Sequence, residues 1–283
     1  MIAFSVIIPL YNKADTVRNT IESVLRQSYP HFEIVVVDDG STDRSAEIVD
    51  AISDTRIRLF RKENGGPGSA RNHGLRQARF EWTIWLDADD LMLADTLEHF
   101  VSVIGTHPQA DMIVGNFELD ESGTIRRHHQ KKLAPNVDNA FRSWFLKELM
   151  PCAGTYCCKT EVLSRHPYQE KLKRSEDTEV LFNVFRESRI VRTDFVVMRY
   201  CRDFSLESRR KTHIDQDFQG HLDFAGKKSL WERICLYELY VEAKNNYPDE
   251  VSSVYPDMER HFMLKIAYFC AFWGRALLRK LDR

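Results

Sequence analysis

Apolar runs alternate with amphipathic segments over the first 118 residues of the chain. Five runs are apolar enough to form buried strands: residues 4–9, 33–38, 56–60, 82–86 and a run that begins at 112. Between these runs, apolar residues recur at steps of three and four, which is typical of amphipathic helices. Strands that alternate with helices are typical of βαβ units. The pattern therefore predicts an α/β fold with a mostly parallel central sheet flanked by helices.

The pattern changes after residue 118. Asp120-Glu121-Ser122-Gly123 is typical of a tight hairpin turn. Further helices are expected at 138–149 and 176–187, a strand within 190–200, and mainly helix from about 219, with a break near Tyr247-Pro248. The second half is therefore expected to end in a helical extension.

Composition narrows the class of protein. The 283 residues are 43% hydrophobic and 29% charged, with a net charge of −2, which is typical of a globular chain with a full core. So small a net charge gives no general attraction for nucleic acid. No apolar run approaches the roughly 20 residues that cross a membrane. The six cysteines lack the spacing of a disulfide framework or a zinc site, so we expect reduced, buried thiols and a cytoplasmic location.

Three carboxylates follow the fourth predicted strand: Asp87, Asp89 and Asp90. The nearest basic residues along the chain are Arg79 and Arg126, so nothing close in sequence neutralises them. One interpretation is a divalent cation that is held at the end of a strand and presented to a phosphate-bearing ligand. The alternative is a polar loop in which Asp90 caps the next helix.

Polar segments follow three of the predicted strands: Tyr11-Asn12, Asp38-Asp39-Gly40-Ser41 and Asp87-Ala88-Asp89-Asp90. In an open α/β sheet, ligands bind beyond the carboxyl ends of the strands. We therefore expect these segments to converge on one edge of the sheet, which unrelated acidic turns would have no reason to do.

Four segments, in this order, resemble the motifs of family 2 glycosyltransferases: residues 7–12, 36–43, 68–75 and 86–90. The match is close over residues 4–118 and weaker to about 210. The resemblance implies an inverting enzyme of the bacterial surface-polysaccharide type, with the GT-A nucleotide-diphospho-sugar transferase fold. The expected divisions are a GT-A domain at 1–215, with a nucleotide-binding half at 1–118 and an acceptor-side half at 119–215, and a C-terminal helical extension at 216–283.

The resemblance also implies roles on the donor side of the site. Asp39 would accept the imide N–H of a uracil, which a carboxylate can do. Asp87 would face the ribose. Asp89 would bind Mg²⁺ or Mn²⁺ that bridges the two phosphates, with Asp87 as a second candidate ligand. Arg71 would meet the diphosphate with its guanidinium group, and Asp90 would support the loop. The remaining predicted donor-binding residues are Pro9, Tyr11, Asn12, Gly68 and Ala88.

These donor-side residues also have structural interpretations, which the sequence leaves open. Asp38 or Asp39 could cap the helix that begins near residues 41–43, and Asn12 could cap the helix before it. Arg71 could form a surface ion pair.

On the acceptor side, Glu176 and Asp177 open a predicted amphipathic helix and resemble the Glu-Asp motif of the family. The resemblance implies that Asp177 is the base that takes the proton of the acceptor hydroxyl, with Glu176 in support. The hydroxyl would attack the anomeric carbon in line, so that its configuration inverts. The alternative is that Asp177, or Ser175 with Thr178, only caps the helix.

The last predicted helix, at about 258–283, has an apolar stripe and a basic end. A helix of this kind can lie on the inner face of the cell membrane or pack on the core, and the sequence leaves both open. The stripe is Met263, Ile266, Phe269, Cys270, Trp273, Leu277 and Leu281, and the basic residues are Lys265, Arg275, Arg279, Lys280 and Arg283.

The resemblance thus implies a metal-dependent hexosyl- or N-acetylhexosaminyltransferase. It would move a sugar from a nucleotide-sugar donor, with UDP-sugars the first choice, to a polysaccharide or glycolipid hydroxyl in cell-envelope polysaccharide biosynthesis. One alternative is a catalytically silent nucleotide-sugar-binding or scaffold protein. Another is a sugar nucleotidyltransferase, which residues 10–13 disfavour because they lack a glycine-rich loop for a triphosphate.

Overall fold

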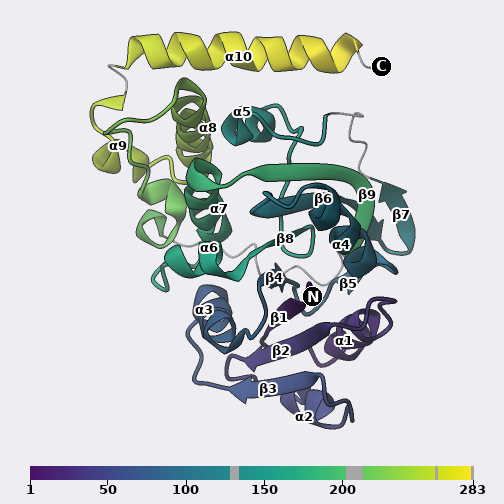
Figure 1. Ribbon diagram of the computed structural model, residues 1–283. Helices are drawn as coiled ribbons and strands as arrows, with labels where there is room; N and C mark the ends of the chain where they lie inside the picture. The colour runs from purple at the N-terminus through teal and green to yellow at the C-terminus, as the bar shows by residue number, and fades with distance from the viewer. Residues whose placement is uncertain (128–133, 202–212, 259–260, 282–283) are drawn as a thin grey trace.

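The computed structural model describes residues 1–127, 134–201, 213–258 and 261–281. The strands in these ranges are β1 (Phe4–Leu10), β2 (Phe32–Asp38), β3 (Ile57–Arg61), β4 (Trp82–Trp85), β5 (Leu91–Met92), β6 (Met112–Glu121), β7 (Thr124–Arg127), β8 (Tyr156–Lys159) and β9 (Ile190–Cys201). They form one sheet in the order β3-β2-β1-β4-β8-β6-β9-β5, and β7 pairs with β6 (Figure 1).

Helices cover both faces of this sheet. Those described are α1 (Val17–Leu25), α2 (Ser45–Asp50), α3 (Pro67–Gln77), α4 (Thr96–Thr106), α5 (Ala140–Phe145), α6 (Thr160–Arg165), α7 (Glu176–Glu187), α8 (Leu230–Asn246), α9 (Val251–Val254) and α10 (Phe262–Leu281), with short 3₁₀ turns η3 (Ile214–Gln216) and η4 (Phe218–Gly220). The predicted α/β class is confirmed.

The first four strands are parallel, as the sequence predicts. Side chains along β1 alternate between two buried clusters. Ile7 joins the cluster that contains residues of α3, whereas Val6 and Ile8 join the one that contains residues of α1 and α4. Gly74 allows α3 to lie close to the sheet, because a Cβ at this position would be 2.3 Å from Cγ2 of Ile7. This close packing determines how deeply the polar residues of α3 are buried.

The sheet as a whole is mixed and not mostly parallel as predicted, because β8 pairs antiparallel with both β4 and β6, and β5 pairs antiparallel with β9. Strands β8 and β5 and helix α6 were not predicted from the sequence. Strand β8 has only four residues, and Tyr156, Cys157 and Cys158 are all buried, so it gives no alternating pattern. Beyond β8 the sheet continues with the parallel pair of β6 and β9.

The predicted hairpin after residue 118 is confirmed. Strands β6 and β7 pair antiparallel around Ser122 and Gly123, whose φ angles are +52° and +82°. Helix α7 has the predicted bounds, whereas α5 is shorter than predicted. Helix α5 begins after Asn139, whose side chain accepts a hydrogen bond from the backbone N–H of Arg142.

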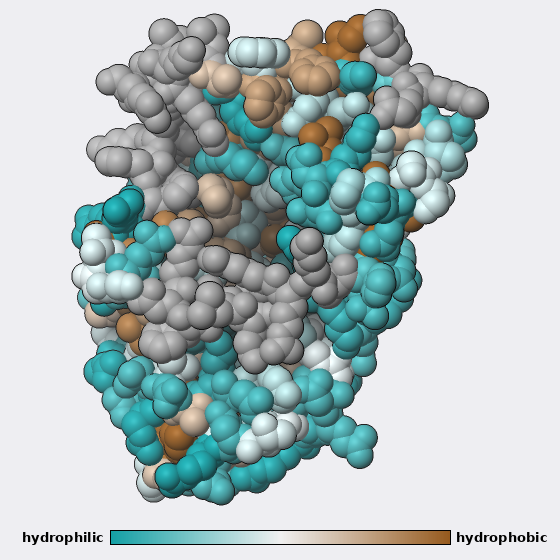
Figure 2. Space-filling model, turned by 180° about the vertical axis from the view of Figure 1, so that it is seen from behind, coloured by the Kyte–Doolittle hydropathy of each residue, from teal (hydrophilic) through white to brown (hydrophobic). Residues whose placement is uncertain are grey.

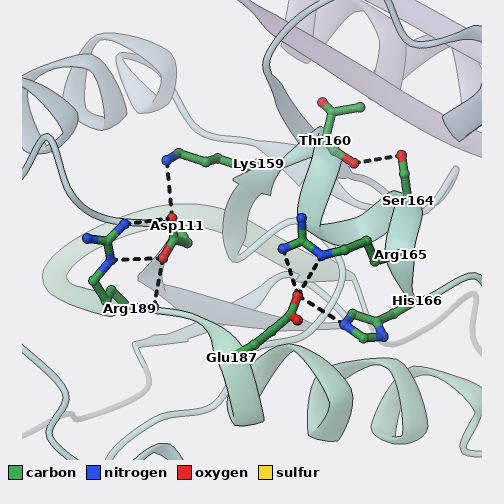
Figure 3. A network of polar contacts seen from close by, with 8 residues as sticks. All are labelled: Asp111, Lys159, Thr160, Ser164, Arg165, His166, Glu187 and Arg189. Carbon is green, nitrogen blue, oxygen red and sulfur yellow. Dashed lines mark hydrogen bonds and ion pairs between the residues drawn. The ribbon is translucent and has the colours of Figure 1, made fainter.

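Two groups of ion pairs hold the amino-terminal ends of β6 and β9 (Figure 3). Asp111, just before β6, lies 3.1 Å from Nζ of Lys159 and 3.1 Å from Nε of Arg189. Burial alone would raise the pKa of Asp111, but its hydrogen bonds to Arg189 and Lys159 lower it overall. Glu187 at the end of α7 pairs with Arg165 and His166 at the end of α6. These contacts lie at the opposite end of the β6–β9 pair from its carboxyl ends.

The C-terminal helices pack on the rest of the molecule. Residues of α8 belong to the same buried cluster as Ile7 and Trp85. Long helix begins at Leu230, later than predicted, because residues 214–220 form the two 3₁₀ turns. The predicted domain boundaries remain a prediction.

Helix α10 crosses over α8 and α5, far from β1–β3 (Figure 1). It packs through Tyr268 and Arg275, while most of the described part of its predicted apolar stripe faces outward. Arg275 is buried beside Glu238, at 2.8 Å, and so does not belong to a basic surface as predicted. No helix in the described ranges combines the length and the apolar character needed to cross a membrane.

All six cysteines lie in described ranges and are free thiols. Cys157, Cys158 and Cys235 are buried as predicted. Cys270 is exposed on the outer side of α10, so the prediction of a buried thiol is wrong there.

Candidate active site

A cleft of about 550 Å³ opens at the carboxyl ends of β1, β2 and β4 and extends to the start of α7. The structure brings together most of the residues that the sequence singles out. Those that line the cleft are Pro9, Tyr11, Asp39, Arg71, Asp87, Ala88, Asp89, Glu176 and Asp177. Asn12, Gly68 and Asp90 are not among the lining residues.

Asp39 is held in one orientation by its own chain. Its carboxylate accepts hydrogen bonds from the backbone N–H groups of Gly65, at 3.0 Å, and Gly66, at 2.7 Å. Nζ of Lys62 lies 2.5 Å from the same carboxylate. Asp39 therefore does not cap α2. The neighbouring Asp38 accepts from the backbone N–H of Ser41, at 3.2 Å, outside the helix.

The loop after β4 carries three acidic side chains in different surroundings. Asp90 is buried and accepts a hydrogen bond from the backbone N–H of Cys201, at 2.9 Å. It therefore supports the loop, as predicted, and does not cap a helix, since α4 begins after Asp95. Burial raises the pKa of Asp90 well above its usual value, and the charge of Asp87 adds to this effect.

Cations from distant parts of the sequence approach this acidic loop. Nζ of Lys13 lies 2.7 Å from Asp89, and Nη2 of Arg71 lies 3.0 Å from Asp87. Burial raises the pKa of Asp89, although Lys13 opposes this rise. The prediction that nothing neutralises the cluster holds only along the sequence, because folding supplies both cations.

Arg71 is buried one turn into α3 and joins two sides of the cleft. Besides Asp87, its guanidinium contacts Glu176, at 3.0 Å, and Asp177, at 3.1 Å. Its carbon Cζ lies 5.3 Å from the centre of the Tyr168 ring. Burial by itself lowers the pKa of Arg71, but the surrounding negative charges, first that of Asp177, raise it well above the usual value. The structure thus excludes a surface ion pair and shows a buried cation shared by three carboxylates.

Asp177 lies in the first turn of α7, where it lines the cleft, and 42% of its side chain is exposed to solvent. Tyr168 lies behind it. Burial, followed by the charge of Asp177, raises the pKa of the Tyr168 hydroxyl, and a hydrogen bond to Asp177 adds to the rise. Ser175 makes no capping hydrogen bond with its side chain, so the alternative in which Ser175 caps α7 is wrong. Asp177 is therefore an accessible carboxylate that is held in place by its contacts with Arg71 and Tyr168.

Glu176 is more deeply buried than Asp177. Burial raises the pKa of Glu176, and the charge of Asp177 adds to this, whereas Arg71 lowers it. Its contact with Arg71 connects the start of α7 to α3. This position is compatible with the predicted role of Glu176 in support of Asp177.

Asn12 and Gly68 lie next to the cleft and help to place neighbouring segments of the chain. Asn12 has a φ of +50° and accepts a hydrogen bond from the backbone N–H of Thr42, at 2.8 Å. It therefore joins the loops after β1 and β2 and does not cap α1, which begins after Thr16. A Cβ on Gly68 would lie 3.1 Å from Cβ of Tyr168, so this glycine allows α3 to approach the Tyr168 segment.

Several cleft residues were not predicted as site residues from the sequence: Lys13, Lys173, Arg174 and Tyr200. Lys13 directly follows the Tyr11-Asn12 segment, and Lys173-Arg174 are separated from the Glu-Asp pair by Ser175 alone, so proximity to a motif was the available signal. Nζ of Lys173 donates to the backbone oxygen of Gly65, at 2.8 Å. Residues 200–205 of the sequence also faintly resemble a later motif of the family, from which no acceptor residue was predicted, and residues 202–205 lie outside the described ranges.

The carboxylates of Asp87 and Asp89 fit a hard divalent cation, which takes one or two carboxylates and completes its shell with water and phosphate oxygens. In the described ranges, no group of three or more His, Cys, Asp or Glu side chains is arranged to hold a metal ion by itself. A cation here would therefore need oxygen ligands from elsewhere.

Several known glycosyltransferases are similar to this chain in sequence. The chain is 38% identical over 122 residues to the glycosyltransferase GlyG of Streptococcus pneumoniae, a match that covers 42% of this chain and 40% of GlyG. It is 30% identical over 184 residues to TarS of Staphylococcus aureus, named poly(ribitol-phosphate) beta-N-acetylglucosaminyltransferase, which covers 62% of this chain and 31% of TarS. An uncharacterised glycosyltransferase of Rickettsia felis is 42% identical over 127 residues, which are 44% of this chain and 21% of that protein. The matched regions are thus less than half of these relatives.

Among solved structures, S. aureus TarS 1-349 in complex with UDP-GlcNAc matches with a TM-score of 0.73 and 23% identity, covering 97% of this chain and 80% of that one. This likeness shows that the two share a GT-A fold. The family model described as glycosyl transferase family 2 matches residues 5–185, more than half of the sequence. The chain belongs to glycosyl transferase family 2.

Proposed function

We propose that this chain transfers a sugar from a UDP-sugar to a hydroxyl group of a carbohydrate or a lipid-linked carbohydrate, with inversion at the anomeric carbon. One observation carries the proposal: a single cleft is lined by Asp39, by the loop with Asp87 and Asp89, and by Asp177. An N-acetylhexosaminyl donor is the first candidate, because the relative TarS is named as an N-acetylglucosaminyltransferase and was crystallised with UDP-GlcNAc.

In this proposal the uracil lies against Asp39. Two backbone amides and Lys62 orient this carboxylate, and the one lone-pair site that these three donors leave can accept the imide N–H. The cleft also contains Lys173, whose positive charge would offset part of the charge on the two phosphates.

Asp87 and Asp89 would hold Mg²⁺ or Mn²⁺ together with the diphosphate. Such an ion would offset the negative charge that develops on the departing nucleoside diphosphate. Since Lys13 contacts Asp89 at 2.7 Å, this lysine would have to move from that carboxylate when the cation binds.

Asp177 would take the proton of the acceptor hydroxyl. Its exposure supports this role, because an acceptor can reach the carboxylate while Arg71 and Tyr168 hold it from behind. The hydroxyl oxygen would form the new bond to the anomeric carbon. The bond to the diphosphate oxygen would break on the opposite side, and its electron pair would leave with the diphosphate. Displacement from the opposite side inverts the configuration.

A thermal-shift screen of nucleotide sugars with and without Mn²⁺ tests the donor and the metal. A donor at a concentration of 100 times its Kd should stabilise the fold by about 2.7 kcal/mol. Asp89→Asn should remove the part of this shift that requires Mn²⁺. The matched control is Asp50→Asn, which changes an aspartate outside the cleft and should keep the shift.

Two results of this screen would count against the proposal. Stabilisation by no nucleotide sugar under any condition would exclude donor binding. Stabilisation without release of UDP, for every donor and acceptor tested, would favour the silent binding protein instead.

We also propose that α10 contacts an anionic membrane surface near a lipid-linked acceptor. Its outward side exposes Met263 (74%) and Trp273 (69%), with Ile266 and Phe269 between them. Brown and tan side chains also gather along the upper edge of the molecule, the region of α10, whereas the lower half is mainly hydrophilic (Figure 2). The sequence of α10 contains lysine and arginine but no aspartate or glutamate. Anionic lipid headgroups would attract such a helix, whereas a second copy of it would be repelled.

Flotation with lipid vesicles tests this contact. Binding should be stronger to vesicles with phosphatidylglycerol than to phosphatidylcholine alone, and the double variant Met263→Gln/Trp273→Gln should bind less. Leu230→Gln is the control, because Leu230 is 59% exposed at the start of α8. Equal binding of the double variant and the wild type would contradict the proposal.

A further inference from the structure

The turn that leads to Asp177 is hydrogen-bonded to the beginning of the C-terminal extension. The backbone N–H of Lys173 donates to the oxygen of Gln216, at 2.7 Å, and the N–H of Phe218 donates to the oxygen of Arg174, at 3.2 Å. Arg174 and Asp217 form an isolated parallel bridge. The segment before Asp177 is therefore paired with residues about 40 positions further along the chain.

Asp217 lies at the centre of this junction and is fully buried. Its Oδ2 accepts a hydrogen bond from the hydroxyl of Tyr247, at 2.8 Å, and lies 3.5 Å from Nε of Arg174. Its Oδ1 accepts from the backbone N–H of Gln219, at 3.0 Å. Tyr247 directly follows α8. One buried carboxylate thus connects a cleft arginine with the end of a helix in the extension.

The turn between Arg174 and Asp177 requires such support. Ser175 has a φ of +56°, in the left-handed region that a non-glycine residue keeps only when its neighbours fix it. Its own side chain makes no capping hydrogen bond to α7. The contacts on either side of Ser175 must therefore hold the turn: those of Arg174 with the extension and those of Glu176 with Arg71.

We propose that Asp217 and Tyr247 are positioning residues for the base of the transfer reaction. They fix Arg174, and through it the turn that sets the carboxylate of Asp177 against the cleft. The extension is then part of the transfer machinery. This inference rests on the proposed role of Asp177.

The variant Tyr247→Phe tests the inference, because it removes one hydroxyl and keeps the ring. Tyr255→Phe is the matched control. The Tyr255 hydroxyl also belongs to the extension, donates to the backbone oxygen of Gln219 and accepts from the N–H of Leu222, but no hydrogen bond joins it to the Asp217 carboxylate. Both variants lose one buried or half-buried hydroxyl of the same region, so they share any general loss of stability.

Two measurements separate positioning from a merely structural role. For Tyr247→Phe we expect kcat to fall at least tenfold while the KM for the donor stays within twofold of the wild type, since small misplacements of a catalytic group lower the rate strongly. We also expect faster hydrogen exchange in peptides that cover residues 172–180. Tyr255→Phe should change neither quantity.

Unchanged kcat in Tyr247→Phe, or an equal fall in both variants, would overturn the inference. A wild-type chain that transfers no sugar would refute the proposed function instead. In that case the hydrogen exchange still decides the structural part, because unchanged exchange in Tyr247→Phe would show that the extension does not fix the turn.

Discussion

On the donor side of the cleft, Asp39 is held by amides from Gly65 and Gly66, no more than 27 residues away. On the acceptor side, Glu176 and Asp177 contact Arg71, which is 105 residues away from Glu176, and their turn is bonded to the extension. The donor side is thus built within neighbouring βαβ units, whereas the acceptor side requires most of the chain. The two sides should therefore respond differently to mutation.

The largest effect should come from the acceptor side. Asp177→Asn keeps the size of the side chain but removes the base, so turnover should fall about 10³-fold. Donor binding should persist, because the substitution leaves Asp39, Asp87 and Asp89 unchanged. Turnover by UDP release and donor affinity by calorimetry give the two values. Near-normal turnover would remove Asp177 from the mechanism, and lost donor affinity would mean that the two sides are not independent.

The link between the two sides is tested by Arg71→Met. This change leaves Asp87, Glu176 and Asp177 without their shared cation, so the free energy of unfolding should fall by about 3 kcal/mol. Burial, and then Asp177, already raises the pKa of Glu176, and Arg71 opposes that rise. Without Arg71 the buried acid should favour its protonated form more strongly. The unfolded chain ionises Glu176 freely as pH rises, whereas the folded variant resists this ionisation. The loss of unfolding free energy should therefore be larger at pH 8 than at pH 5.

Urea unfolding at the two pH values measures this effect. Arg44→Met is the control, since Arg44 pairs with Glu47 on an exposed surface and should change stability by less than about 0.5 kcal/mol. Equal losses for both arginine variants would mean that Arg71 does not couple the two sides.

The smallest effect should come from outside the cleft. Asp111→Asn, just before β6, should lower the free energy of unfolding by about 1 kcal/mol at neutral pH, because it weakens the contacts with Lys159 and Arg189. The pKa of Asp111 is lowered in the folded chain. Its contribution is therefore present above the unfolded value of about 3.9 and is lost as pH falls through the folded value.

Unfolding curves of Asp111→Asn and the wild type should accordingly converge at acid pH. Turnover at neutral pH should be unchanged. A changed turnover would show that the ends of β6 and β9 influence the cleft from a distance.

The same contrast explains how much could be predicted from the sequence. Strands β1 and β2 have clear apolar runs, and the residues that follow them lie at one edge because parallel strands end there. Strand β8 gave no signal, since its pairing partners are distant and both of its faces are buried. Local pattern therefore predicted the donor side well and the middle of the sheet poorly.

Side-chain partners were predicted least well. The contacts of Arg71 with three carboxylates and of Lys13 with Asp89 depend on how separate segments meet, and no periodicity encodes them. Helix α10 is a further example. Its apolar stripe was identified, but the helix packs through Tyr268 and Arg275 on another side, because Glu238 supplies a buried partner for the arginine.

Gly74 lies outside the cleft, but it determines where the charged group of Arg71 lies within it. Any side chain at this position would press on Ile7 and displace α3 from β1. Arg71 lies on the same helix less than one turn earlier, so its guanidinium would be carried outward as well. The distances from that guanidinium to Asp87, Glu176 and Asp177 would then lengthen together. Because Gly74 has no side chain, α3 can lie close enough to β1 for Arg71 to contact the loop after β4 and the start of α7 at the same time.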